Sequence, residues 1–143
     1  MGYKNRTPGG TSRWATTRKE KSAVGQPIVH VEIMGKDAIA LRKFYAELFG
    51  WEIAEPVAEM GNYSMFGHET AGVGGGIGEQ PDKATRVTAY VEVPDLQATL
   101  DNAVALGGRV VMPPMDMPGG GPALAQFADP DGNVTGLVKS APQ

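Results

Sequence analysis

The chain of 143 residues contains no cysteine and only two histidines. Without thiols it can form no disulfide, no thiolate metal site and no cysteine nucleophile. No stretch approaches the roughly 18 to 20 consecutive apolar residues that a membrane-spanning helix needs. The first ten residues, MGYKNRTPGG, also lack the apolar core of a secretion signal. We therefore expect a cytoplasmic protein that does not enter a membrane.

The net charge of −3 is distributed unevenly along the chain. Residues 1–26 carry a net charge of +5, and residues 27–143 carry −8. Because an acidic body is a poor surface for nucleic acid, we do not expect nucleic-acid binding by the body. The sequence predicts a flexible basic arm at 1–26, followed by one domain at 27–140. The arm is either solvated or, helped by Trp14, in contact with nucleic acid, a membrane surface or a neighbouring chain.

The domain contains the same order of elements twice. The stretch IVHVEI alternates in the manner of a strand, Asp37 stands where a helix N-cap belongs, and Gly50 supplies the C-terminal stop. RVTAYVEV, Asp95 and Gly107–Gly108 repeat this order. Three strand candidates follow each helix: WEIAEPVA, NYSMFG and VGGGIG in the first half, and RVVM, PALAQFA and NVTGLV in the second.

This repeat predicts an α+β domain of two tandem βαβββ modules, at about 28–78 and 86–138. Each half alone would expose one face of its sheet, so the halves should join. We expect a curved, barrel-like mixed sheet of eight strands, with two helices outside and a cavity inside. Tyr45, Phe49 and Trp51 are interpreted as core residues.

Three stretches in this order carry a family resemblance: HVEIMGKDAIALRKFYAELFGWEI, VEVPDLQATLDNAVALGG and FADPDGNVTGLV. They resemble the vicinal oxygen chelate superfamily, which includes glyoxalase I, bleomycin-resistance proteins, fosfomycin-resistance enzymes and extradiol dioxygenases. The resemblance covers about residues 28–138 and implies the fold described above, a small-molecule ligand and a homodimer. In metal-dependent members, His, Glu or Gln side chains from the first and fourth strands of each unit hold a divalent ion.

The resemblance also implies that this metal centre is largely missing. His30 lies seven residues before Asp37 and matches the ligand position of the first strand. The equivalent residue of the second half is Thr88, and the ligand position on the final strand is Gly136. Because three or four His or carboxylate ligands must converge on such an ion, we expect no cofactor. The alternative is Ni, Zn, Mn or Fe bound by His30 with non-standard partners, such as Glu32 or Glu92.

Alternation along the strands suggests a group of polar residues in the cavity. His30 and Glu32 share one face of the first strand, and Thr88, Tyr90 and Glu92 share one face of its repeat partner. If the ligand face is the inner face, His30 and Glu32 could act there as acid and base. Alternatively, the glutamates are structural polar groups paired with nearby Arg or His, or they face the helices.

The stretch VMPPMDMPGGGPA, residues 111–123, combines four prolines with three consecutive glycines. The prolines disfavour regular structure, and the glycines permit unusual backbone angles. Met112, Met115 and Met117 add a polarizable apolar surface. We interpret the stretch either as a loop that covers the cavity or as an exposed connection whose methionines close one end of the sheet.

The favoured function is the binding of an apolar or aromatic small molecule in a metal-poor cavity, for sequestration or sensing. The alternative is a lyase, isomerase or dioxygenase acting on a small oxygenated substrate through His30 and either a non-standard metal partner or Glu32. Interaction through the basic arm is a third class. The expected ligand-binding residues are His30, Glu32, Thr88, Tyr90, Glu92, Met112, Met115 and Met117.

Overall fold

The computed structural model describes residues 25–141, so the expected basic arm lies outside the described residues except for its last two. The strands are β1 (Ile28–Met34), β2 (Ser64–Phe66), β3 (Gly74–Gly78), β4 (Arg86–Val93), β5 (Arg109–Met115), β6 (Leu124–Ala128) and β7 (Val134–Lys139). The helices are α2 (Ala38–Phe49), α3 (His68–Ala71) and α4 (Leu96–Ala105), with 3₁₀ turns η3 (Ala58–Met60) and η4 (Pro118–Gly120). No helix in this range is long and apolar enough to span a membrane.

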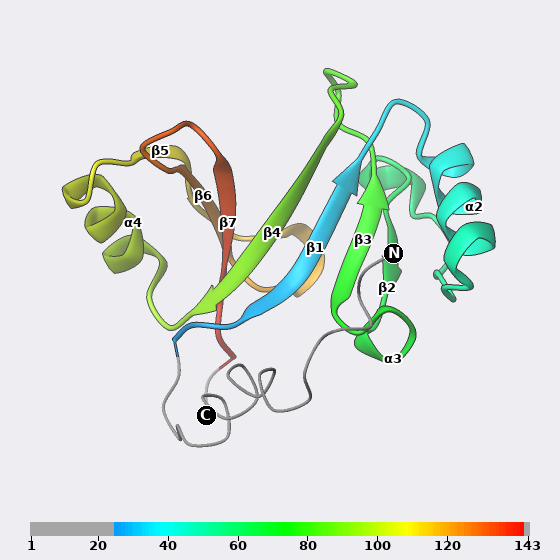
Figure 1. The fold of residues 1–143 in the computed structure, drawn as a ribbon, viewed down its shortest axis with the longest axis horizontal. Coiled ribbons are helices and arrows are strands. Elements are labelled where there is room, and N and C mark those ends of the chain that lie inside the picture. The colour runs from blue at the N-terminus through cyan, green and yellow to red at the C-terminus, as the bar shows by residue number, and fades with distance from the viewer. Residues whose placement is uncertain (1–24, 142–143) are drawn as a thin grey trace, which may run out of the picture.

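The strands form one mixed sheet in the order β2-β3-β1-β4-β7-β6-β5. The two modules meet where β1 and β4 pair antiparallel, and within each module the first and last strands run parallel, β1 with β3 and β4 with β7. Helices α2 and α4 lie at the two outer sides of the sheet (Figure 1). The repeat of two modules is thus confirmed in its connectivity.

The prediction of an eight-stranded, barrel-like sheet is wrong in two respects, because the sheet has seven strands and is not closed. Its two edges are β2 and β5. Strand β5 includes Pro113 and Pro114. Proline has no amide hydrogen for a ladder hydrogen bond and is tolerated on an edge strand. The composition of β5 therefore suits the open edge at which the sheet ends.

The absent strand is WEIAEPVA, residues 51–58. The Arg42 guanidinium donates hydrogen bonds to the backbone oxygens of Ile53 (2.7 Å) and Ala54 (2.8 Å). Pro56 offers no amide hydrogen. With two carbonyls already bonded to a side chain and one donor missing, this segment forms no named strand. It makes an isolated bridge between Val57 and Tyr63 and one hydrogen bond from the Ala54 amide to the Met65 oxygen (2.8 Å).

The predicted starts of both helices and the predicted end of α2 are confirmed. Asp37 Oδ1 accepts a hydrogen bond from the Ala40 amide (3.1 Å), and Asp95 Oδ1 accepts one from the Ala98 amide (2.9 Å). Gly50 ends α2 with a φ of 74°, a left-handed conformation that glycine adopts without a steric penalty. Helix α4 ends at Ala105 with Leu106 as its C-cap, just before the predicted stop at Gly107–Gly108.

Each helix packs on its own half of the sheet. Leu96 and Leu100 of α4 join a buried cluster with Val93 and Leu137. The other cluster contains Ile33, Ile53, Phe66 and Ile77, and Leu41, Tyr45 and Trp51 pack against it. The interpretation of Phe49 as a core residue is wrong, because 56% of this side chain is exposed at the end of α2.

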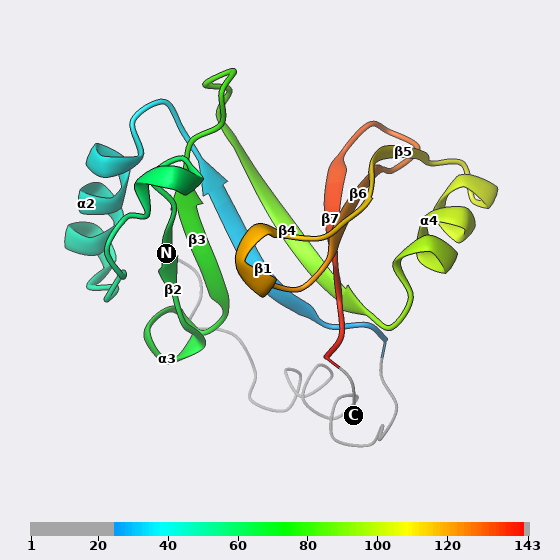
Figure 2. The same cartoon turned by 180° about the vertical axis from the view of Figure 1, so that it is seen from behind.

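The expected loop over 111–123 is only partly a loop, because residues 111–115 belong to β5. The pairing of Val110, Met112 and Met115 with β6 includes two register irregularities. Such irregularities accommodate the two prolines in an edge strand. The loop proper begins at Asp116 and contains η4, which lies over the middle of the sheet in Figure 2.

Candidate functional site

A cleft of about 1290 Å³ lies on the face of the sheet opposite α2 and α4. Along β1, Val31 and Ile33 pack toward α2, whereas His30, Glu32 and Met34 line the cleft. Along β4, Val93 packs toward α4, whereas Tyr90 and Glu92 line the cleft. The period-two alternation of the two central strands therefore decides which side chains face the ligand space.

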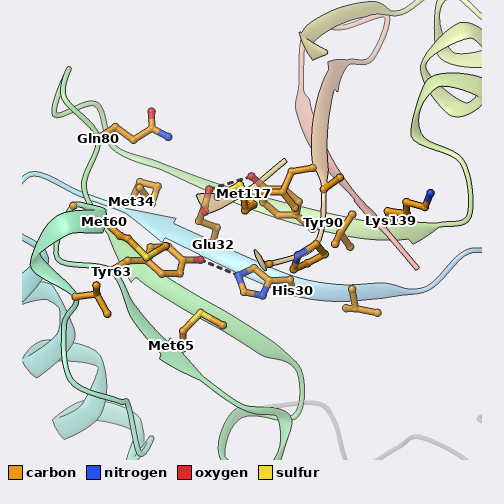
Figure 3. A pocket seen from close by; sticks show the side chains of 18 of the residues that line it. His30, Glu32, Met34, Met60, Tyr63, Met65, Gln80, Tyr90, Met117 and Lys139 are labelled. Carbon is orange, nitrogen blue, oxygen red and sulfur yellow. Dashed lines mark hydrogen bonds between the residues drawn. The ribbon is translucent and has the colours of Figure 1, made fainter. Parts of the chain in front are cut away.

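The walls of the cleft are mainly apolar and come from several segments. Met60 is the last residue of η3, Met65 is on β2, and Met117 and Pro122 flank η4. Figure 3 shows Met60, Met65 and Met117 around the side chains of Glu32, Tyr63 and His30. Methionine is flexible and polarizable, so this wall can adapt to irregular or planar apolar molecules.

Two sets of hydrogen bonds lie on the floor of the cleft. A bond of 2.9 Å joins His30 Nε2 and Tyr63 Oη, and Tyr90 Oη donates to Glu32 Oε1 over 3.3 Å. The Gln126 amide donates in turn to Tyr90 Oη over 3.0 Å. The ring of His30 meets that of Tyr90 edge to face, with 5.8 Å between centroids. This ring contact joins the two hydrogen-bonded sets into one polar unit within a mainly apolar cleft.

Burial shifts the protonation equilibria of this unit. It raises the pKa of Glu32, although hydrogen bonds from Tyr63 and Tyr90 and the charge of Arg86 oppose the shift. It lowers the pKa of His30. Burial and the nearby Glu32 charge raise the pKa of Tyr90 to about 12 and also raise that of Tyr63. Burial thus favours the neutral form of both the histidine and the carboxyl group.

Two glycines make room for the tyrosine rings. Gly136 pairs with Tyr90, and a Cβ added to it would lie 2.3 Å from Cδ2 of that ring. Gly76 pairs with Glu32, and a Cβ added there would lie 2.2 Å from Cζ of Tyr63. In both modules, the glycine on the last strand leaves the space that a tyrosine ring fills.

This arrangement does not fit the metal centre of the metal-dependent members that the sequence resembles. The ligand position on the final strand is Gly136, and the ring of Tyr90 covers it. Within residues 25–141, no three His, Cys, Asp or Glu side chains are grouped so that they could hold an ion. The side chains that converge here are phenols, one imidazole and one carboxyl group, rather than a set of three or four His or carboxylate donors.

The structure brings together most of the residues expected from the sequence. His30, Glu32, Tyr90, Glu92 and Met117 line the cleft. Thr88 is 2% exposed and does not line it. Met112 and Met115 lie on the edge strand β5, away from the cleft lining.

Sequence reasoning missed Tyr63 and Gln126, along with three methionines of the walls. Met34 could have been found, because it is the next residue on the alternating face after Glu32. Gln126 could have been found from the turn at 129–132, since a hairpin there pairs it with Gly136. Tyr63 precedes β2 and carries no local signal that directs it to β1.

The comparisons with known proteins agree with this fold. The chain belongs to the Glyoxalase/Bleomycin resistance protein/Dioxygenase superfamily, whose family model matches residues 27–137. Among its relatives is the protein of Mycobacterium tuberculosis named "Putative glyoxylase CFP32", which is 33% identical over 113 residues. The match covers 75% of this chain but only 43% of that relative, so the chain spans less than half of its length.

Two solved structures show the same fold. Methylmalonyl-CoA epimerase from Mycobacterium tuberculosis superposes with a TM-score of 0.65 at 14% identity, covering 87% of this chain and 96% of the other. The hypothetical protein BH1468 from Bacillus halodurans gives a TM-score of 0.63 at 10% identity, covering 84% and 98%. At these identities, the likeness concerns the fold alone.

Proposed function

We propose that this protein binds a small, mostly apolar or aromatic molecule in the cleft without a resident metal ion, for sequestration or sensing. One observation carries the proposal: a cleft of about 1290 Å³ has mainly apolar walls and a hydrogen-bonded polar unit on its floor. Small-molecule sites have this composition, because apolar walls supply affinity and a few polar groups fix orientation.

The test is a screen of aromatic and alicyclic compounds by thermal shift, on protein stripped of metal with EDTA. A ligand at about 100 times its Kd should stabilise the fold by about 2.7 kcal/mol. Tyr63→Phe, which removes a hydroxyl group from the cleft floor, should alter the ranking of the compounds. Tyr45→Phe makes the same change on α2, outside the cleft lining, and should leave the ranking unchanged. Stabilisation that requires added metal would contradict the proposal.

A second candidate is a lyase, isomerase or dioxygenase that acts on a small oxygenated substrate. It is favoured by the opposite pKa shifts of His30 and Glu32, which both line the cleft. The printed name of the 33% identical relative points in the same direction. If His30 and Glu32 supply acid and base, turnover should survive EDTA and be lost in both His30→Gln and Glu32→Gln. Turnover that EDTA abolishes and a divalent ion restores would instead support His30 with non-standard metal ligands.

The expectations of a cytoplasmic location, a homodimer and no binding to nucleic acid stay predictions. Light scattering coupled to size-exclusion chromatography tests the dimer. Loss of salt-sensitive nucleic-acid binding on deletion of residues 1–26 would instead show a role for the arm.

A further inference from the structure

We propose that the ligand of the cleft is an amphipathic amine, with an apolar body against the methionine walls and a protonated amino group paired with Glu32. This inference rests on the proposed binding function and adds the charge of the ligand to it. Four features of the described residues support it: the charge of the lining, the surroundings of Glu32, the aromatic groups beside it, and the place of Lys139.

The charged groups that line the cleft favour a cation. Four glutamates and two lysines contribute to the lining. Glu79 and Lys83 form an ion pair with each other at 2.5 Å, so their charges largely cancel. The other charged groups of the lining are three carboxylates and one ammonium group: Glu32, Glu59, Glu92 and Lys139. Because a cleft of one sign with low-dielectric walls concentrates the opposite charge, the potential here attracts positive ligands.

Glu32 has neutral partners in place of a counter-ion. Within residues 25–141, no Lys, Arg or His nitrogen lies within 4.0 Å of its carboxyl oxygens. Arg86 influences it only through longer-range charge and donates its own hydrogen bond to Gln80. A buried carboxylate without a cationic partner is unfavourable. A carboxylate accepts about four hydrogen bonds, so acceptor sites remain beside those used by tyrosine.

The groups around Glu32 are compatible with an ammonium ion. Tyr63 and Tyr90 lie on either side of it (Figure 3), and their phenol oxygens can accept hydrogen bonds from an ammonium group. His30 lines the same floor, and burial lowers its pKa, so at neutral pH it adds no opposing positive charge. The methionine walls accept the apolar part of such a ligand.

Lys139 is the one lining cation without an ion pair in the described residues, and it does not compete for this position. It is exposed and lies at the opposite end of the cleft from Tyr63 (Figure 3). A ligand carboxylate bound near Lys139 would leave Glu32 unpaired, whereas a ligand amine near Glu32 pairs the buried charge. The distribution of charge therefore favours the amine.

The experiment compares three naphthalenes of one shape and different charge: 1-naphthylmethylamine, 1-naphthalenemethanol and 1-naphthoate. Binding to the full chain is measured by calorimetry at pH 7, with wild type, Glu32→Gln and Lys139→Gln. We expect wild type to bind the amine about tenfold or more tightly than the alcohol, because a charged hydrogen bond exceeds a neutral one by this order. The naphthoate should bind most weakly. Glu32→Gln should remove the preference for the amine, and Lys139→Gln should retain it.

Equal affinity for the amine and the alcohol, or tightest binding of the naphthoate, would overturn the amine proposal while the binding function stands. The same holds for an amine preference that persists in Glu32→Gln. Failure of all three compounds to bind at millimolar concentration would overturn both proposals. The comparison of ligand charge uses wild type alone, so it does not depend on the folding of any variant.

Discussion

The two modules place a tyrosine ring over an equivalent glycine but take the tyrosine from different parts of the chain. In the second module, Tyr90 is on the first strand and covers Gly136 of its neighbour. In the first module, the position equivalent to Tyr90, five residues before the helix cap, is Glu32, and Tyr63 reaches across β3 from the segment before β2. The same packing solution is thus reached by two routes, and it brings both phenols to one carboxyl group.

The modules also differ under their helices. Leu100 lies five residues after the cap Asp95 and is 1% exposed in the core. The equivalent residue after Asp37 is Arg42, which bonds the carbonyls of Ile53 and Ala54. Both helices pack on apolar clusters, but at this position one module has a buried leucine and the other has a side chain that bonds the backbone of the 51–58 segment.

The largest effect on stability is expected at Leu100, the position at which the two modules have a buried leucine and an arginine. Leu100→Ala should lower the free energy of unfolding by about 3 kcal/mol, because it leaves a cavity in a closed cluster. Urea denaturation followed by circular dichroism measures this. Val104→Ala, at a half-exposed site on the same helix, is the matched control and should cost much less. Equal costs would show that the cluster is not the stabilising feature.

The tyrosine and glycine pairs should behave alike in the two modules. Gly136→Ala and Gly76→Ala should each destabilise the protein by about 1 to 3 kcal/mol through overpacking against a ring. Gly136→Ala combined with Tyr90→Ala should destabilise the protein by less than the sum of the two single substitutions. The same should hold for Gly76→Ala combined with Tyr63→Ala. Thermal denaturation of the two double-mutant cycles provides the measurement. Additive changes in stability in either cycle would show that the glycine and tyrosine of that module do not interact as they do in the other module.

Removing the Arg42 guanidinium should have a smaller effect. Arg42→Met keeps much of the apolar stem and loses the bonds to the carbonyls of Ile53 and Ala54, for a cost of about 1 kcal/mol. Hydrogen exchange should show faster exchange of the Ala54 amide, which donates to the Met65 carbonyl. An unchanged exchange rate would mean that Arg42 does not hold the 51–58 segment in place.

The smallest changes should appear in the pH dependence of stability, and they should come from the first module. The raised pKa of Glu32 makes its ionisation unfavourable in the folded state; this cost is absent below its ordinary pKa of 4.5 and complete above its folded pKa. Glu32→Gln should therefore raise the melting temperature at pH 8 and leave it unchanged at pH 4.

His30 should act at a different pH and in the opposite sense. Because burial lowers its pKa, its contribution is present above its ordinary pKa of 6.5 and is lost as the pH falls through the folded pKa. His30→Gln should remove this acid-side loss. The equivalent residues of the second module are Thr88 and Tyr90, and the pKa of Tyr90 is raised to about 12, so neither titrates in this range. If the melting temperatures of Glu32→Gln and His30→Gln match those of wild type between pH 4 and 8, the pKa shifts assigned to Glu32 and His30 are contradicted.

The sequence by itself determined the elements whose signals are local. The caps at Asp37 and Asp95, the alternation of β1 and β4, and the turn before β7 depend on residues close together in the chain. The turn illustrates this, because Asp129 accepts hydrogen bonds from the amides of Asp131 and Asn133. Gly136 at the metal-ligand position that the family resemblance implies was also found from the sequence, because that position is counted from the same turn.

The tertiary structure alone decided how the floor of the cleft is built and that the sheet stays open. Tyr63, Glu32, Tyr90 and Gln126 come from four separate segments, and their contacts depend on strand order and on the space above two glycines. At 51–58, where the sequence predicts a strand, two carbonyls bond instead to a side chain of the preceding helix. No local pattern encodes such contacts, because side-chain direction and packing between distant segments are fixed only when the strands pair.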